Sequence, residues 1–200
     1  GHRYISIRQF DKAIADFKHA AALRQGLENE VEQDGLPNAR NIPVSTLHGN
    51  IYYHLGLAYY LKNDMENARE AYMKCLETSE MPDNVVSASH WLYMINRRLG
   101  DEEAAKAVLE PINDQMDIIE NMAYHKLCLF YKGEIALEEL VDGKYSDIMN
   151  DATWYGVGNW HLYNGEAEKA RDVFDQVLAG PTWASFGYIA AEAASVREFQ

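Results

Sequence analysis

Residues 49–82 read GNIYYHLGLAYYLKNDMENAREAYMKCLETSEMP, and this stretch decides the fold. It divides at Asn63-Asp64 into two segments with apolar residues three or four positions apart, each long enough for about three to four helical turns. Gly56 and Ala68 are small residues at the positions where two such helices would cross closely, and aromatic residues fill the space beside them. The stretch therefore predicts a pair of closely packed helices.

This pair resembles a tetratricopeptide repeat, a unit of about 34 residues with an aromatic residue, Leu-Gly, Tyr, Ala, an aromatic residue and Ala at the same spacings. The resemblance implies an all-α fold, a right-handed superhelix of stacked helix pairs with about ten helices in this chain. It also implies a scaffold that binds other proteins rather than a particular reaction.

Small residues recur along the chain at multiples of this 34-residue period. Gly158 and Ala170 follow Gly56 and Ala68 at three times the repeat period, and Ala136 falls at an intermediate phase. We therefore expect four consecutive units: a repeat at 49–82, a divergent repeat at 83–116, a degenerate repeat at 117–150 and a repeat at 151–182.

The N-terminal residues 1–27 are predicted to be a partial first repeat, mainly its second helix. The first helix of that unit is cut to a stub at 1–6, which leaves an apolar face without its partner. Residues that precede Gly1 in a longer protein would supply it, or the end is frayed. A third alternative is that another copy of the chain covers this face in a homo-oligomer.

Residues 28–48 depart from the pattern and are predicted to be an insertion or linker. The acidic run Glu28–Asp34 could extend the preceding helix, and Gly35–Pro43 is expected to be a loop. Ser45 or Thr46 is a plausible N-cap of the next helix. Insertions in repeat arrays lie on loops and are often functional, so this loop is a second candidate for binding.

The last segment, 183–200, is predicted to be a capping helix, because the final apolar face of an array would otherwise be wet. We expect one face to pack inward and the other to be polar. The inward residues would be Ala190, Ala193, Ala194 and Val196. The polar residues would be Glu192, Arg197 and Glu198.

The net charge of the chain limits the classes of partner that it can bind. The 31 acidic and 18 basic residues give a formal net charge of −13, whereas nucleic acid and anionic lipid both require a cationic surface. We therefore expect no nucleic acid partner, and a protein or peptide partner that can be cationic. No apolar run reaches about 18 residues, so no membrane insertion is expected. The location is predicted to be cytoplasmic, or periplasmic if a leader has been removed.

Patterns that carry chemistry are missing from the sequence. It has no HExxH pair, no phosphate-binding GxxxxGK[ST] or GxGxxG loop and no GxSxG nucleophile motif. We expect no catalysis, no metal and no cofactor. His90, His125 and His161 are interpreted as hydrogen-bonded core histidines. Cys75 and Cys128 are interpreted as small buried side chains.

Partner binding is predicted in the concave groove, which the first helix of each unit lines. The candidates lie off the packing face of these helices and supply aromatic, amide and cationic groups for an extended segment or a helix. They are Asn50, Tyr53, Leu57, Tyr60, His90, Met94, Arg97, Tyr155, Asn159 and Tyr163. The alternative is that the Tyr and Leu side chains only pack against the neighbouring helix.

A narrower resemblance rests on two stretches. HWLYMINRRLGDEEAAKAVLEPI at 90–112 and AYHKLCLFYKGE at 123–134, followed by a short EEL segment, are similar to bacterial tetratricopeptide proteins that include the NlpI-type periplasmic lipoproteins. This likeness implies an adaptor that brings hydrolases or proteases together at the envelope. The alternative function is a non-catalytic portion of a larger enzyme or envelope complex.

Overall fold

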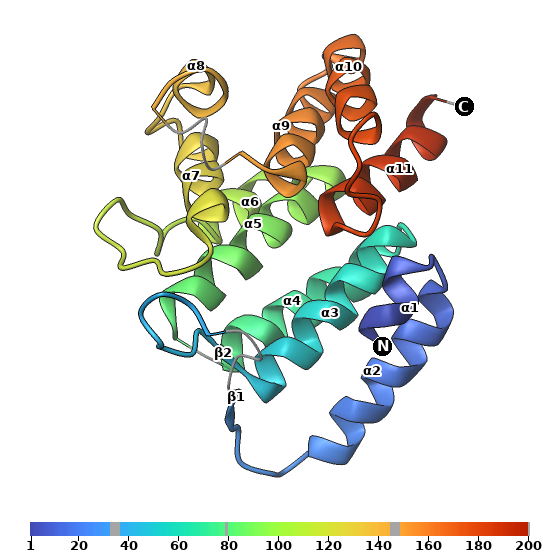
Figure 1. Cartoon of the computed structure of the whole chain (residues 1–200), viewed down its shortest axis with the longest axis vertical. Coiled ribbons are helices and arrows are strands. Elements are labelled where there is room, and N and C mark those ends of the chain that lie inside the picture. The colour runs from blue at the N-terminus through green and yellow to red at the C-terminus, as the bar shows by residue number, and fades with distance from the viewer. Residues whose placement is uncertain (33–36, 79, 145–148, 200) are drawn as a thin grey trace.

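A computed structural model describes residues 1–32, 37–78, 80–144 and 149–199, and this part of the chain is mostly helical (Figure 1). The all-α prediction is confirmed. No helix among the described residues has both the length and the apolar character to cross a membrane. The elements are α1 (His2–Ser6), α2 (Phe10–Arg24), β1 (Val31–Glu32), β2 (Ser45–Thr46), α3 (Leu47–Leu61), α4 (Met65–Thr78), α5 (Pro82–Leu99), α6 (Glu102–Ala107), α7 (Met122–Tyr131), α8 (Leu137–Val141), α9 (Asp151–Tyr163), α10 (Ala167–Leu178) and α11 (Phe186–Phe199).

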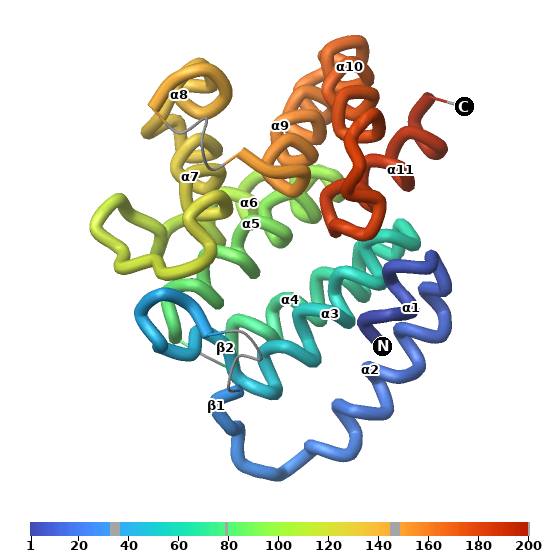
Figure 2. Tube along the Cα trace, viewed as in Figure 1, coloured from blue at the N-terminus to red at the C-terminus, as the bar shows by residue number. Residues whose placement is uncertain are grey.

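The helices form consecutive pairs that stack on one another. α3 packs on α4, α5 on α6, α7 on α8 and α9 on α10, while α5 also contacts α4, α7 and α9. The chain curves as it proceeds, so that α11 packs against α9 and α10 and also reaches α3 (Figure 2). The first helices of the pairs therefore face a shared interior.

Two glycines set the distance between the helices of their pairs. A Cβ on Gly56 would lie 2.6 Å from the ring of Tyr72, and one on Gly158 would lie 2.5 Å from the ring of Phe174. Such distances are far below van der Waals contact, so only glycine lets each ring lie flat on the facing helix. Ala68 is 0% exposed at the same crossing. The sequence pattern thus predicted these crossings, because the two helices can approach this closely only where the residues between them are small.

The pair α7 and α8 departs from the repeat pattern. α8 has only five residues, and Ala136 is its exposed N-cap rather than a packed residue. The buried residue of this helix is Leu140 instead. The interpretation of Ala136 as the repeat alanine of this unit is therefore wrong. The sequence also predicts a break in the chain at Ser146, and this residue lies outside the described residues.

The insertion also differs from the prediction. α2 ends at Arg24, and Gly26 follows with a φ of 77°, so residues 28–32 do not extend this helix. β1 instead pairs antiparallel with β2, with Val31 opposite Thr46. Thr46 is the N-cap of α3, as expected, and its Oγ1 accepts the Gly49 N–H at 3.1 Å. Residues 33–36, which include the predicted loop start at Gly35, lie outside the described part.

α11 closes the array against both ends. A Cβ on Gly187 would lie 2.1 Å from the backbone of Asp151, so α11 crosses the first turn of α9 at backbone contact. Arg8, which follows α1, donates to Glu192 of α11 at 2.7 Å and to the carbonyl of Trp183 at 2.9 Å. The last helix thereby bridges the C-terminal and N-terminal helices.

The expected faces of α11 are mostly correct. Ala190 and Ala194 are buried, but Val196 is 54% exposed and the prediction that it packs inward is wrong. Val196 lies two positions, about 200° of helix rotation, from Ala194 and so points to the other side. Glu198 on the polar side pairs with Arg98 at 2.7 Å.

Candidate partner-binding pocket

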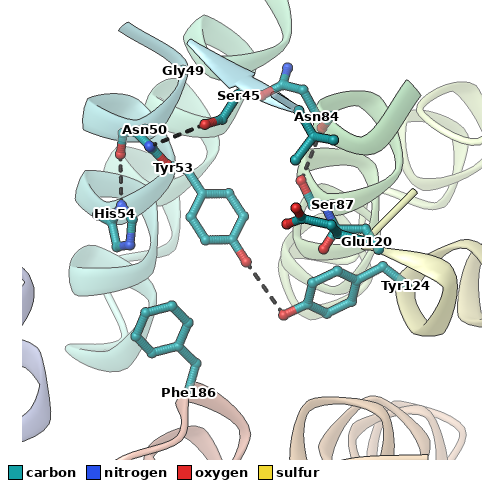
Figure 3. Close-up of a pocket in the computed structure, with 12 residues that line it drawn as sticks. Ser45, Gly49, Asn50, Tyr53, His54, Asn84, Ser87, Glu120, Tyr124 and Phe186 are labelled. Carbon is teal, nitrogen blue, oxygen red and sulfur yellow. Dashed lines mark hydrogen bonds between the residues drawn. The ribbon is translucent and has the colours of Figure 1, made fainter. Parts of the chain in front are cut away.

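A pocket of about 360 Å³ opens where the first helices of three consecutive pairs meet (Figure 3). This volume lies within the range of about 300–1,000 Å³ that is typical of ligand sites. The walls come from β2, α3, α5, α7, the segment before α7, and the start of α11. The lining residues are Val44, Ser45, Gly49, Asn50, Tyr53, His54, Asn84, Ser87, Glu120, Asn121, Tyr124 and Phe186.

Asn50 links the α3 wall to the short sheet. Its Nδ2 donates to the carboxylate of Glu32 on β1 and, at 3.4 Å, to the hydroxyl of Ser45 on β2. The sheet is thereby fixed against the first turns of α3, although each strand has only two residues. The wall of the pocket that α3 and the sheet form is therefore polar, and hydrogen bonds from Asn50 hold its two parts together.

Three side chains form a directed hydrogen-bond chain that leads from the core to the wall of the pocket. Trp91 Nε1 donates to the Tyr53 hydroxyl at 2.9 Å, and Tyr53 donates in turn to the Tyr124 hydroxyl at 3.4 Å. Burial raises the pKa of both tyrosines, so both hydroxyls are protonated at neutral pH. With the indole as donor to Tyr53 and Tyr53 as donor to Tyr124, the chain runs outward from the core. The proton of Tyr124 then remains to meet an acceptor in the pocket.

His54 contributes a neutral ring to the opposite side. Its Nδ1 lies 2.8 Å from the Asn50 carbonyl, so Nδ1 carries the proton and donates. Burial is the largest cause that lowers the pKa of His54 to about 4. The imidazole stands edge-on to Phe186, with ring centroids 5.7 Å apart. At neutral pH this wall therefore carries aromatic surface without positive charge.

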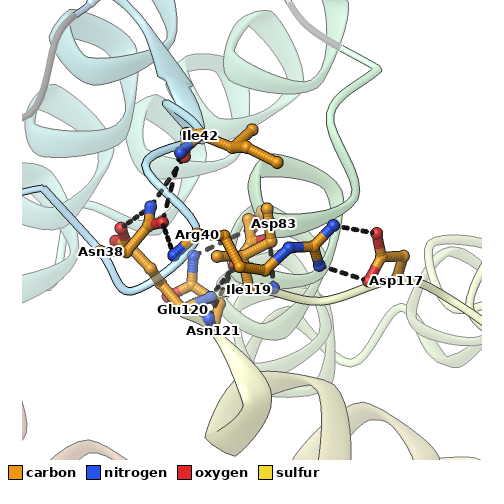
Figure 4. Close-up of polar contacts among 8 residues, drawn as sticks. All are labelled: Asn38, Arg40, Ile42, Asp83, Asp117, Ile119, Glu120 and Asn121. Carbon is orange, nitrogen blue, oxygen red and sulfur yellow. Dashed lines mark hydrogen bonds and ion pairs between the residues drawn. The ribbon is translucent and has the colours of Figure 1, made fainter.

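The outer rim joins two segments that are distant in the sequence (Figure 4). Asn38 of the insertion donates to Glu120 at 2.8 Å and to the Ile42 carbonyl at 2.7 Å. Arg40 donates to both carboxylate oxygens of Asp117, at 2.7 and 2.9 Å. The insertion is thus held against the segment that leads into α7.

Asp83 holds the backbone of the same rim in place through hydrogen bonds. This residue of the first turn of α5 is 2% exposed. One carboxylate oxygen accepts the Ile119 N–H at 2.9 Å, and the other accepts the N–H groups of Glu120 and Asn121 at 2.8 and 2.7 Å. These three bonds fix the backbone that carries Glu120 at the edge of the pocket.

Comparison with known families identifies the helix pair that forms one side of this pocket. Residues 49–80, which cover nearly all of α3 and α4, match the profile of the tetratricopeptide repeat. This stretch is a tetratricopeptide repeat. Curated proteins give no match to the chain. Repeats of this type build extended concave binding surfaces, which indicates a general role in protein–protein interaction.

The predicted groove residues divide into three groups. Asn50 and Tyr53, both on the first helix of the tetratricopeptide repeat, line the pocket. Arg97 and Tyr163 are partly exposed elsewhere. The remaining six are at most 2% exposed, so in this structure they offer a partner no surface: Leu57, Tyr60, His90, Met94, Tyr155 and Asn159. That these six residues contact a partner stays a prediction, and their burial does not favour it.

Curvature explains this burial. The array brings the repeat close enough to α9 for the Tyr60 and Tyr155 hydroxyls to lie 2.5 Å apart. Asn159 donates to the Tyr60 hydroxyl at 3.3 Å. The Trp91 ring packs edge-on to Tyr60 at 5.0 Å between centroids. The inner helices thus contact one another at this end of the repeat, whereas its N-terminal end leaves the pocket open.

Arg97 and Tyr163 meet at a different place. The Arg97 guanidinium lies 4.5 Å from the centroid of the Tyr163 ring and donates to the Tyr93 hydroxyl at 3.1 Å. Arg97 also lines a second cavity of about 420 Å³ between α5, α6 and α7. The structure therefore separates this pair from Asn50 and Tyr53.

The core histidines lie as interpreted. His125 is 1% exposed, with Nε2 2.8 Å from the Asn113 carbonyl, and His161 is 7% exposed, with Nδ1 2.6 Å from Glu166. Both free cysteines are buried as well. Among the described residues, no group of three or more His, Cys, Asp or Glu side chains is arranged to hold a metal ion.

Some of the pocket-lining residues that the sequence prediction did not select follow the repeat period. Asn84 and Ser87 lie one repeat period of 34 residues after Asn50 and Tyr53, and Asn121 lies two periods after Tyr53. Applying the period to α5 would have selected Asn84 and Ser87, although it would also have kept Met94, which lies one period after Tyr60. Phe186 likewise lies four periods after Asn50, whereas Glu120 gave no such signal, because long-range folding alone brings it to the pocket.

Proposed function

We propose that the chain binds an extended segment of a partner protein in the pocket between α3, α5 and α7, and that it acts by binding rather than by catalysis. The observation that carries this proposal is the pocket itself. It lies at the junction of consecutive first helices, where repeat arrays offer their concave surface. It also combines hydroxyl, amide and carboxylate groups with aromatic rings.

These groups suit a peptide. The Tyr124 hydroxyl has a proton for a peptide carbonyl, and the Glu120 carboxylate at the rim accepts hydrogen bonds. Tyr53 and Phe186 supply flat apolar surface for a side chain. Bonds from the insertion, the sheet and Asp83 hold these groups in place before a partner arrives, which reduces the ordering cost of binding.

A selection of immobilised chain against a random peptide library tests the proposal. We expect peptides that bind the wild type and lose at least about tenfold in affinity for Phe186→Ala, because the substitution removes one aromatic wall. Phe186 is only partly buried, so the fold should survive, and circular dichroism verifies it.

Tyr52→Ala is the matched control. Tyr52 is adjacent to Tyr53 on α3 and is also partly buried, but it lines a separate cavity beside α2 and α4. Peptides that lose affinity equally for both variants, or a library that yields no binder, would contradict the proposal.

A further inference from the structure

We propose that the pocket takes a basic side chain, lysine or arginine, of the partner peptide; this inference rests on the function proposed above. Three features of the pocket carry it: a rim carboxylate with no lysine or arginine among the described lining residues, aromatic rings that face the cavity, and the neutral state of its histidine. Each is independent of the others.

The carboxylates that line the pocket or lie next to its lining residues make this region acidic. Glu120 lines it, and the Glu32 carboxylate lies directly behind Asn50. Asp83 is buried under the rim, and its oxygens bind backbone N–H groups. None of the described lining residues is a lysine or an arginine. Arg40, the cation of the insertion, has both ends of its guanidinium on Asp117.

The aromatic rings fit the stem and head of a basic side chain. Tyr53, Tyr124 and Phe186 point toward the cavity from three different elements (Figure 3). A cation within about 6 Å of such a ring face is attracted by the ring quadrupole, by about 0.5–2 kcal/mol depending on desolvation. The methylene stem of lysine or arginine packs on the same rings.

His54 does not oppose a cation. The low pKa that burial gives this side chain, about 4, keeps it uncharged at neutral pH. The net charge of −13 further favours the approach of a basic segment. A C-terminal carboxylate would instead meet Glu120 and find no cation among the described lining residues. The chemistry therefore rejects acidic peptide ends.

The test uses the peptides selected with the wild-type chain and measures their affinity by fluorescence anisotropy. We expect the selected sequences to share a lysine or arginine, and replacement of that residue by norleucine to weaken binding at least about tenfold. Glu120→Gln removes the rim charge and keeps the shape. We expect it to weaken the basic peptide about five- to tenfold and to reduce its salt dependence.

Asp114→Asn is the matched control, because Asp114 is an exposed carboxylate of the same α6–α7 segment that does not line the pocket. We expect less than about a twofold change there. Selected peptides without a shared basic residue, yet sensitive to Phe186→Ala, would overturn this inference and leave the proposed function intact. A library without binders would overturn both. Equal losses for Glu120→Gln and Asp114→Asn would assign the preference to overall charge and overturn the inference.

Discussion

At the scale of single residues, His90 shows how this core handles a polar group. It is 0% exposed and stacks on the Tyr124 ring with centroids 4.7 Å apart. The Tyr131 hydroxyl lies 3.3 Å from its Nδ1. Burial lowers the pKa of His90 from 6.5 to about 3. The side chain is therefore neutral whenever the protein is folded near neutral pH.

This shift predicts a pH dependence of stability. In the unfolded chain the histidine takes up a proton below about pH 6.5, whereas in the folded chain it does so only near pH 3. The unfolded state therefore binds more protons in this window, and stability is lost as the pH falls through it. Between pH 7 and 4.5 His90 alone should cost roughly 2 kcal/mol of unfolding free energy.

Urea unfolding of the wild type and of His90→Phe at both pH values measures this cost. We expect the variant to lose roughly 2 kcal/mol less than the wild type on acidification, since other titrating groups are common to both proteins. His19→Gln, at an exposed histidine of α2, is the control and should behave as the wild type does. An equal loss for His90→Phe and the wild type would show that burial of His90 does not set the dependence.

At the scale of elements, the buried Asp83 carboxylate stabilises the rim of the pocket more than the exposed Arg40–Asp117 ion pair does. Asp83 accepts three backbone N–H groups at 2.7–2.9 Å. The Arg40–Asp117 pair is bidentate, but its side chains are 46% and 70% exposed. Exposed pairs contribute about 0–1 kcal/mol, whereas a buried acceptor whose removal leaves its donors unsatisfied matters much more.

We therefore predict that Asp83→Asn lowers the unfolding free energy by roughly 3 kcal/mol and that Asp117→Asn lowers it by less than about 1 kcal/mol. The amide keeps the shape of Asp83 but replaces one acceptor by a donor that faces other donors. Urea unfolding measures both values. Amide hydrogen exchange at 119–121 should accelerate only in Asp83→Asn. Comparable effects of the two substitutions would refute this ranking.

The same elements show what could be predicted from the sequence. The helix pairs follow from short-range patterns, because Gly56 and Ala68 must be small where helices cross. The N-cap Thr46 is equally local. The rim is not: Asn38 and Glu120 are 82 residues apart, and neither belongs to a periodic segment. Only the folded array brings them together.

The candidate site was predictable to the same extent. Asn50 and Tyr53 were found because their positions on α3 follow from the repeat. Tyr155 lies three periods after Tyr53 and Asn159 lies three periods after Leu57, yet both are buried, because the curvature brings α9 onto Tyr60. Curvature is a sum over many interfaces, and no short pattern encodes it. The likeness to NlpI-type proteins and the bacterial source stay predictions.

At the scale of the whole molecule, α11 connects the ends of the array. It packs on α9 and α10, reaches α3, and binds Arg8 through Glu192. An open repeat array unfolds as a chain of neighbours, often from its ends. Here the N-terminal and C-terminal helices also have each other as neighbours, so the loss of one end removes support from the other.

We predict a single cooperative unfolding transition. The fluorescence of the four tryptophans, of which Trp91 lies in the core and Trp183 near the closure, should change together with far-ultraviolet circular dichroism in urea. Arg8→Ala with Glu192→Ala should broaden the transition or separate the two signals. The variant Lys74→Ala with Glu70→Ala removes an exposed ion pair within α4 and is the control. Two resolved transitions in the wild type would contradict this prediction.

The closure by α11 also limits how such a chain can be altered. In an open solenoid a helix pair can be duplicated or deleted, and the ends simply move apart or together. Here one additional pair would rotate α11 away from Arg8 and α3, and one fewer would drive it into them. The number of pairs between α3 and α11 is therefore set by this contact, and we expect changes in length to be tolerated best in connecting segments such as the insertion before α3.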